Sequence, residues 1–248
     1  MRLNVLTIVF SFFVTTAFAQ WGDNYIKLSS TITTETKAIS GFDKIEISED
    51  FVVYIMFSDS EEKVEIEANE NLHELIQVSK EGSTLKIDTK SYSTSSGGIG
   101  RKNGAEERLV AHITAKRLKE IKADEDVVIE LKDKFIGDKL SIILNEDCTL
   151  QGHLEVQDLK VLLEEDCEIA IEGSAQAMDV EANEDCMIKG SDFVVGNLKI
   201  QLDEDSEAKL TVNGEVDLVA KDDSYFHYRG DANFVRKRLR GDSEVKTW

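Results

Sequence analysis

The sequence predicts an all-β fold, a parallel β-solenoid (β-helix) with coils of about 19 residues. The first observation is a recurring Asp-Cys or Asp-Ser pair. Its aspartates are separated by 19, 19, 20, 18 and 19 residues, and they are Asp147, Asp166, Asp185, Asp205, Asp223 and Asp242. The second observation is a period-two apolar pattern before each pair. The third is the absence of proline, which would interrupt strand pairing.

Each repeat predicts two short strands joined by an acidic corner. The positions seven, five and three residues before the aspartate are mostly apolar, as in Leu140, Ile142 and Leu144. A second apolar segment follows the corner, and a glycine is then expected to turn the chain. These glycines are Gly152, Gly173, Gly190, Gly214 and Gly230. Stacking such units in parallel lets each coil cover the apolar face of its neighbour.

The front of the chain carries a related pattern. A variant pair, Asp126-Val127, lies 21 residues before the first repeat. The segment FDKIEISEDFV at 42–52 aligns without gaps to LKEIKADEDVV at 118–128, and both place a Glu-Asp corner after an isoleucine. The N-terminal β region is therefore predicted to begin with a related coil. Further strands are expected near 51–57, 63–68 and 84–89.

Five segments are expected along the chain. Residues 1–19 are typical of a secretory signal peptide, because a charged start and an apolar run precede an Ala-x-Ala cleavage site. An N-terminal extension (20–40) and the N-terminal β region (41–90) follow. Residues 91–107, rich in Ser and Gly, predict a flexible loop. Residues 108–248 hold the solenoid repeats and a basic C-terminal cap.

The last coil differs from the others in its charge. We expect Val235, Lys237 and Leu239 to face the core, surrounded by arginines at 236, 238 and 240. A basic, less apolar coil suits a cap that protects an exposed strand edge. The alternative is a docking patch for an acidic partner.

The three cysteines, Cys148, Cys167 and Cys186, share one repeat position, so they are expected to stack about 4.8 Å apart. A disulfide needs Cβ atoms about 3.8 Å apart. We therefore favour a ladder of small residues that fills a tight corner, although pairing of two cysteines stays open. A metal site is the weaker alternative, because no Cys-x-x-Cys spacing or paired histidine accompanies them.

The corner carboxylates form the candidate site. They are predicted to line one edge of the solenoid in two columns, where like charges about 5 Å apart repel by about 1 kcal/mol in water. Bound Ca²⁺ would relieve this repulsion, because that ion prefers hard oxygen ligands. The alternative is that each Asp hydrogen-bonds its own turn while each Glu points into solvent. The candidate Ca²⁺ ladder consists of Glu146, Asp147, Glu165, Asp166, Glu184, Asp185, Glu204 and Asp205.

Residues 41–248 resemble the exported family described as putative auto-transporter adhesin, head GIN domain, found largely in Bacteroidota. The resemblance is carried by GFDKIEI at 41–47, GSTLKI at 82–87 and the series of small-residue corners. It implies a parallel β-helical fold, export and adhesion, and it brings no catalytic residues. Corners in the family commonly read Ser-Gly-Ala-Ser, whereas the corners here are acidic, as in Asn-Glu-Asp-Cys at 145–148, and the tripeptide Gly-Ile-Asn is missing.

The charge restricts the class of partner. Lys and Arg number 29 against 49 Asp and Glu, a net charge of −20, which argues against nucleic acids and anionic membrane surfaces. We expect an exported, non-enzymatic interaction or adhesin-like protein in the periplasm, on the outer-membrane surface or outside the cell. Its protein or glycan partner is unspecified, and the only cofactor considered is Ca²⁺. The alternative is a carbohydrate-binding or polysaccharide-cleaving β-helix that uses the face around 225–228.

Overall fold

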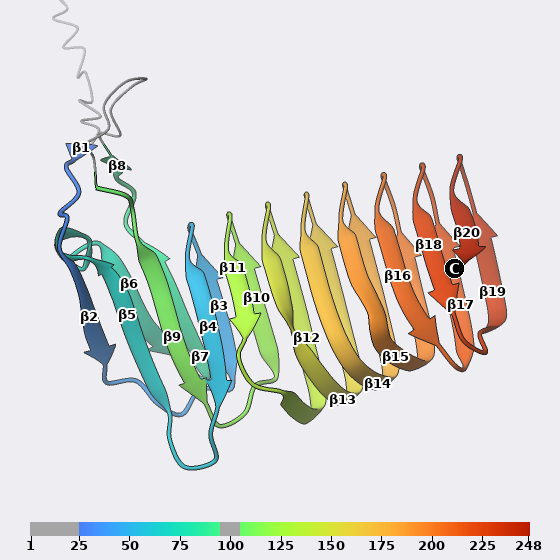
Figure 1. Cartoon of the computed structure of the whole chain (residues 1–248), viewed down its shortest axis with the longest axis horizontal. Coiled ribbons are helices and arrows are strands. Elements are labelled where there is room, and N and C mark those ends of the chain that lie inside the picture. The colour runs from blue at the N-terminus through green and yellow to red at the C-terminus, as the bar shows by residue number, and fades with distance from the viewer. Residues whose placement is uncertain (1–24, 95–104) are drawn as a thin grey trace, which may run out of the picture.

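The computed structural model describes residues 25–94 and 105–248, so the predicted signal peptide and most of the predicted loop lie outside the described residues. The chain is all-β and forms a β-solenoid of about seven turns, with stacked parallel coils of about 19 residues. The fold class predicted from the repeat is confirmed. In Figure 1 the coils stand side by side along the long axis of the molecule, and one apolar core runs through them from Phe42 to Phe226.

The regular coils follow the 19-residue step of the sequence. Leu140 pairs with Leu159, Leu159 with Met178 and Met178 with Leu198, and all four side chains are buried. The strands are β12 (Phe135–Asn145), β13 (Thr149–Glu164), β14 (Glu168–Asn183), β15 (Met187–Leu202), β16 (Glu207–Val212), β17 (Glu215–Ala220), β18 (Tyr225–Arg229), β19 (Asn233–Leu239) and β20 (Glu244–Thr247).

Three of the five predicted glycine corners do not end a strand, contrary to our expectation. Gly214 lies between β16 and β17, and Gly230 lies between β18 and β19, as expected. Strands β13, β14 and β15 run for 16 residues each, through Gly152, Gly173 and Gly190. At Gly173 φ is +109°, and a Cβ atom there would lie 2.1 Å from the carbonyl oxygen of Leu154. Glycine is needed at this position because neighbouring coils approach so closely, and the strand bends without ending.

The predicted N-terminal coil is also confirmed. It consists of β3 (Lys44–Ser48) and β4 (Val52–Phe57), which pair in parallel with β10 (Glu120–Asp124) and β11 (Val128–Leu131). The register joins Ile45 to Ile121 and Val52 to Val128, as the gapless alignment of the two segments requires.

The order of coils in space departs from their order in sequence. Strand β7 (Thr84–Thr89) pairs in parallel with β3, and β9 (Leu109–Ala115) pairs in parallel with β4. Strands β10 and β11 pair with the other edges of β3 and β4. The coil formed by β7 and β9 therefore lies on the N-terminal side of the coil formed by β3 and β4, at the end of the stack. The chain must then cross the first coil, through residues 116–119, to begin β10.

An antiparallel cap closes the N-terminal end, and the sequence did not predict it. Strand β5 pairs antiparallel with β9, β2 with β5, and β6 with β7. Figure 1 shows these strands at the end of the stack opposite to β19 and β20. Their bounds are β2 (Ile32–Lys37), β5 (Lys63–Asn69) and β6 (Ile76–Glu81), accompanied by β1 (Tyr25–Ile26), β8 (Ser93–Thr94) and the 3₁₀ turn η1 (Glu70–Leu72).

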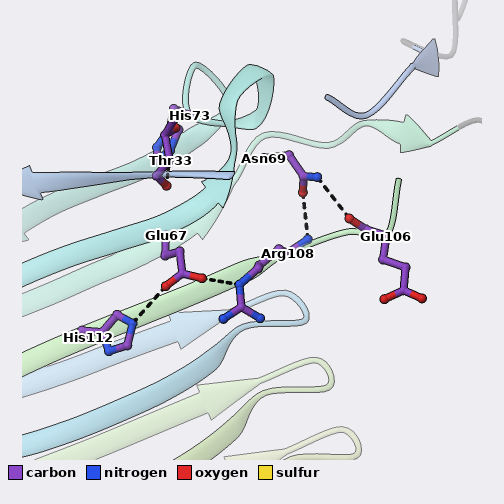
Figure 2. Close-up of polar contacts among 7 residues, drawn as sticks. All are labelled: Thr33, Glu67, Asn69, His73, Glu106, Arg108 and His112. Atoms are coloured by element: carbon purple, nitrogen blue, oxygen red, sulfur yellow. Dashed lines mark hydrogen bonds and ion pairs between the residues drawn. The ribbon is translucent and has the colours of Figure 1, made fainter. Parts of the chain in front are cut away.

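Polar contacts hold this cap together, and Figure 2 shows those among Glu67, Asn69, Glu106, Arg108 and His112. The fully buried amide of Asn69 donates to the carbonyl oxygens of Ser29 (2.8 Å) and Glu106 (3.1 Å), and its oxygen accepts from the backbone N–H of Arg108 (2.8 Å). Glu67 forms ion pairs with Arg108 and, at 3.6 Å, with His112. Single side chains therefore tie together segments far apart in the sequence.

The last coil corrects one prediction. Val235 was expected to face the core, yet it is 56% exposed, because the register shifts between Val216 and Asp217 and places Phe234 opposite Val216. Lys237 and Leu239 lie opposite the buried Leu218 and Ala220, as expected of core-facing positions, yet both are exposed as well. The Phe234 ring packs edge-on against Tyr228 at 5.1 Å between centroids. The larger ring covers the apolar end of the stack better than valine, and the bulge makes room for it.

Candidate functional site

The acidic corners form one edge of the solenoid, visible as the row of narrow tips in Figure 1. Seven corners hold two consecutive non-glycine residues with positive φ. Glu165 and Asp166, for example, have φ values of 56° and 57°. All eight carboxylates of the candidate Ca²⁺ ladder occupy such corners and are exposed; they are Glu146, Asp147, Glu165, Asp166, Glu184, Asp185, Glu204 and Asp205. The structure thus brings them into two columns along one edge.

Backbone hydrogen bonds continue through the corners. The N–H of Asp166 donates to the carbonyl oxygen of Glu184 in the next coil at 2.9 Å, and Asp185 donates to Glu204 at the same distance. The left-handed conformation costs roughly 1–2 kcal/mol per non-glycine residue. It persists because the ladder between coils fixes the backbone at both positions.

The small residue after each Asp closes its corner. The thiol of Cys186 donates to the carbonyl oxygen of Asn183 at 3.0 Å, and the hydroxyl of Ser224 donates to the carbonyl oxygen of Lys221 at 2.6 Å. The cysteines Cys148, Cys167 and Cys186 are buried and free, so the predicted ladder of small residues is present. The hydrogen bond with Cys167, together with burial, raises the pKa of the Cys148 thiol well above its usual range.

The residues two positions before each corner aspartate form a further row along the stack. Hydrogen bonds within this row limit the charge repulsion between coils. The Asn145 amide donates to Asp124 at 2.6 Å, and the Asn183 amide donates to Glu164 at 3.1 Å, so carboxylates alternate with neutral donors. The corner columns themselves lack such alternation. No group of three or more His, Cys, Asp or Glu side chains that would hold a metal ion occurs in the part of the chain that the structure describes. Ca²⁺ binding stays a prediction.

A groove of about 630 Å³ crosses the coils on another face, and the sequence did not predict it. We call it the axial groove; it is lined by residues 139–141, 158–160, 177–179 and 197–199, with Lys119, Glu215, Asp217 and Val235. Its floor is apolar and consists of Leu140, Leu159, Met178 and Leu198.

Charges of opposite sign pair along this groove. Lys139 lies 3.1 Å from Asp158, and Lys199 lies 2.9 Å from Asp179, in each case between neighbouring coils. The alternation is visible in the sequence once the repeats are aligned, eight and six residues before each corner aspartate. This alternation of charge is a weaker repeat signal than the Asp-Cys and Asp-Ser pairs of the corners.

A second hollow, of about 890 Å³, lies where the solenoid meets its N-terminal coils. We call it the junction hollow. It is lined by Lys44, by residues 57–59 at the end of β4, by the crossing connection 116–120 and by residues 134–139 at the start of β12. In Figure 1, β4 ends and β12 begins at the edge opposite to the corner tips.

Two extra residues in one coil help to form this hollow. Ile129 pairs with Leu150, 21 positions away, whereas Phe135 pairs with Leu154, 19 positions away. Residues 132–134 therefore loop out between β11 and β12. The 21-residue spacing before Asp147 is the sequence signal of this insertion, and only the structure shows what it builds.

The lining of the junction hollow is basic in an otherwise acidic protein. It contains six Lys or Arg side chains and three acidic ones, together with Phe57, Leu118, Phe135 and Ile136. Lys119 lies 2.6 Å from Asp43, and its hydrogen bond, with one from Ser83, holds the pKa of the Asp43 carboxyl below its usual range. The hollow thus joins cations to apolar surface.

The family model described as putative auto-transporter adhesin, head GIN domain, matches residues 41–232. No curated protein shows a significant match to the chain. Within the described residues, no helix is long and apolar enough to cross a membrane.

Three solved structures share the fold. A putative lipid binding protein from Parabacteroides distasonis is 17% identical, with a TM-score of 0.68 over 91% of this chain and 100% of that chain. A putative adhesin from Bacteroides fragilis is 18% identical, with a TM-score of 0.66 over 90% and 98%. A putative adhesin from Parabacteroides merdae is 20% identical, with a TM-score of 0.63 over 91% and 99%. At these identities the likeness concerns the fold alone.

Proposed function

Because the chain belongs to the family described as putative auto-transporter adhesin, head GIN domain, we propose that it is an exported, non-enzymatic interaction protein of adhesin-like character. The family and the similar solved structures carry the names of adhesins or of a lipid-binding protein, and none carries the name of an enzyme. The proposed location is the cell surface or the periplasm.

The observation that carries the proposal is the equivalence of the coils. Cleavage of a polysaccharide needs two carboxylates in different environments that flank one substrate. Here seven corners share one backbone conformation, and no corner residue lines the axial groove or the junction hollow. The acidic pairs therefore support a structural repeat better than a catalytic site.

The axial groove is the proposed contact surface for a partner. It crosses several coils, and its paired charges on an apolar floor suit an extended protein segment. The alternative carbohydrate face around 225–228 offers less surface, because Tyr228 packs between Phe226 and Phe234. A protein partner is accordingly preferred to a glycan.

Surface labelling tests the location. Lysines of the axial groove such as Lys160 are exposed, so an amine-reactive biotin reagent that does not cross membranes should label the protein on intact cells. Labelling that appears only after lysis would contradict a surface location and favour the periplasm. Incubation with a panel of polysaccharides should release no reducing ends, and release would overturn the non-enzymatic proposal.

Stabilisation by Ca²⁺ is the finer part of this proposal. A ligand that binds the folded state alone must raise its stability. Thermal melts in Ca²⁺ and in chelator, at equal ionic strength, should therefore differ in midpoint. Equal midpoints would remove Ca²⁺ from the proposal and leave the corner carboxylates with a structural role alone.

A second candidate function is the binding of an amphiphilic molecule. The junction hollow favours it, because it places exposed apolar side chains beside cations. The name of the similar Parabacteroides distasonis protein, a putative lipid binding protein, agrees with this candidate. Binding of any acyl-chain probe to the purified protein would support it, and failure of every such probe to bind would exclude it.

A further inference from the structure

We propose that the junction hollow binds a single amphiphile with one anionic head group, whose chain lies on Phe57, Phe135 and Ile136 and whose head group contacts Lys116 and Arg117. This inference rests on the second candidate function and names its ligand class and its site. The ligand is one molecule with an acyl or alkyl chain and a terminal carboxylate or phosphate.

The apolar half of the site consists of the exposed Ile136, the half-buried Phe57 and, beneath them, the buried Phe135. Ile136 is 72% exposed, the largest exposure among the described large apolar side chains. It follows Phe135, whose ring meets Phe57 edge-on at 5.3 Å between centroids, and both rings line the hollow. Covering apolar surface gains roughly 25 cal/mol per Å², so an acyl chain laid on these side chains would be stabilised.

The basic half of the site contains two cations that form no ion pair with a described residue. Four of its six basic side chains form ion pairs: Lys44 with Glu120 (3.2 Å), Lys119 with Asp43 (2.6 Å), Lys134 with Glu155 (2.8 Å) and Lys139 with Asp158 (3.1 Å).

Lys116 and Arg117 differ from these four. Both are exposed, both line the hollow, and neither forms an ion pair with a described residue. In a chain of net charge −20, these two adjacent cations beside apolar surface form a local basic patch. A carboxylate or phosphate fits them, because guanidinium binds both groups through paired hydrogen bonds.

Size and overall charge favour one molecule over a membrane. The volume of about 890 Å³ falls within the roughly 300–1,000 Å³ of small-molecule sites. An anionic bilayer would face the whole protein, whose net charge of −20 repels it. A single anion interacts mainly with the charges nearest to it. At Lys116 and Arg117 these are two cations that form no ion pair with a described residue.

Competition against a fluorescent probe tests the inference with the full chain. Dansyl-labelled undecanoic acid serves as the probe. Dodecanoate, dodecyl phosphate, dodecanol and dodecyltrimethylammonium serve as competitors, each below its micelle concentration. Both anions should displace the probe, dodecanol should need about tenfold more, and the cation should fail. The ratio of the two anions identifies the preferred head group.

Two matched variants locate the site. The double variant Lys116→Glu with Arg117→Glu should raise the Kd of the probe by about tenfold or more. Lys80→Glu with Lys90→Glu, which alters by the same charge two exposed lysines that line neither the axial groove nor the junction hollow, should leave the Kd of the probe unchanged. Ile136→Asp tests the apolar half of the site and should also raise the Kd of the probe. Since all these positions are exposed, unchanged melting temperatures confirm that each variant folds.

The outcomes separate the inference from the function on which it rests. Equal displacement by dodecanol and dodecanoate would overturn the anionic head group while keeping the amphiphile function. Failure of the probe to bind would overturn both. Equal weakening by the two double variants would overturn the assignment to the junction hollow.

Discussion

The two edges of the same coils differ in how strictly they repeat. At the corner edge, seven turns share one pair of left-handed residues, and each pair is followed by a buried residue, which is Phe51, Val127, a cysteine or a serine. At the opposite edge the coils differ: residues 132–134 loop out, the register of β15 shifts near Gly190, and a connection crosses the first coil. Repetition specifies the stack, and the irregular edge forms the junction hollow, with its basic and apolar lining.

The largest expected effect is at the irregular edge. Gly173→Ala should lower the free energy of unfolding by about 3 kcal/mol or more, because its Cβ atom would lie 2.1 Å from the Leu154 carbonyl oxygen and force the coils apart. Gly82→Ala is the control: its φ is also positive, but no atom lies within 4 Å, so about 1 kcal/mol is expected. Equal losses in urea unfolding would show that the coils can separate freely.

The N-terminal cap should also depend on single residues. Asn69→Ala removes three hydrogen bonds from a fully buried site, so a loss of about 2–3 kcal/mol is expected. Asn71→Ala removes two hydrogen bonds from an exposed site and should cost less than about 1 kcal/mol. The same unfolding measurement compares them. A larger loss for Asn71 would refute the role given to Asn69.

A corner should tolerate change and even improve. Glu165→Asn with Asp166→Gly suits two left-handed residues in succession, so the free energy of unfolding should rise by about 1 kcal/mol. Glu165→Gln with Asp166→Asn removes the charges but keeps side chains at both positions. If the second variant gained as much as the first, charge repulsion would be the main cost of the corner. A lower free energy of unfolding for the first variant would contradict the argument that the left-handed backbone of the corner is costly for non-glycine residues.

The smallest expected effect depends on pH. Burial, followed by the charges of Glu125 and Asp50, raises the pKa of Glu49 above its usual range. The penalty of ionising Glu49 is complete above its folded-state pKa and disappears below the unfolded value of about 4.3. Glu49→Gln should therefore add less than about 1 kcal/mol at neutral pH and nothing at low pH.

Asp43→Asn should change the pH dependence of the free energy of unfolding in the opposite direction to Glu49→Gln. The hydrogen bond from Lys119 lowers the pKa of Asp43, so the stability that it contributes is present at neutral pH and is lost as the pH falls. The variant should be less stable at neutral pH and should approach the native chain in acid. Parallel pH profiles for both variants would show that neither carboxyl is perturbed as described.

The repeated part of the fold could be predicted because each coil restates the same local rule. Period-two apolar residues, the Glu-Asp corner and the shared position of Cys148, Cys167 and Cys186 each appear several times. The placement of the candidate Ca²⁺ carboxylates along one edge followed from the same periodicity.

The irregular parts could not be predicted, because each occurs once. The β7–β9 coil lies out of sequence order, and only tertiary pairing reveals the antiparallel cap on β9. The bulge that exposes Val235 depends on how Phe234 packs against Tyr228. The 21-residue spacing near Asp126 was visible, yet its consequence, the junction hollow, requires the crossing connection as well.

Hydrogen exchange with and without dodecanoate compares the two edges in one measurement. If the irregular edge carries the binding site, amides of residues 57–59, 116–120 and 132–139 should exchange more slowly in the complex, while the seven corners should stay unchanged. Slower exchange at the corners, or an equal change along the whole solenoid, would contradict the division between a structural edge and a binding edge.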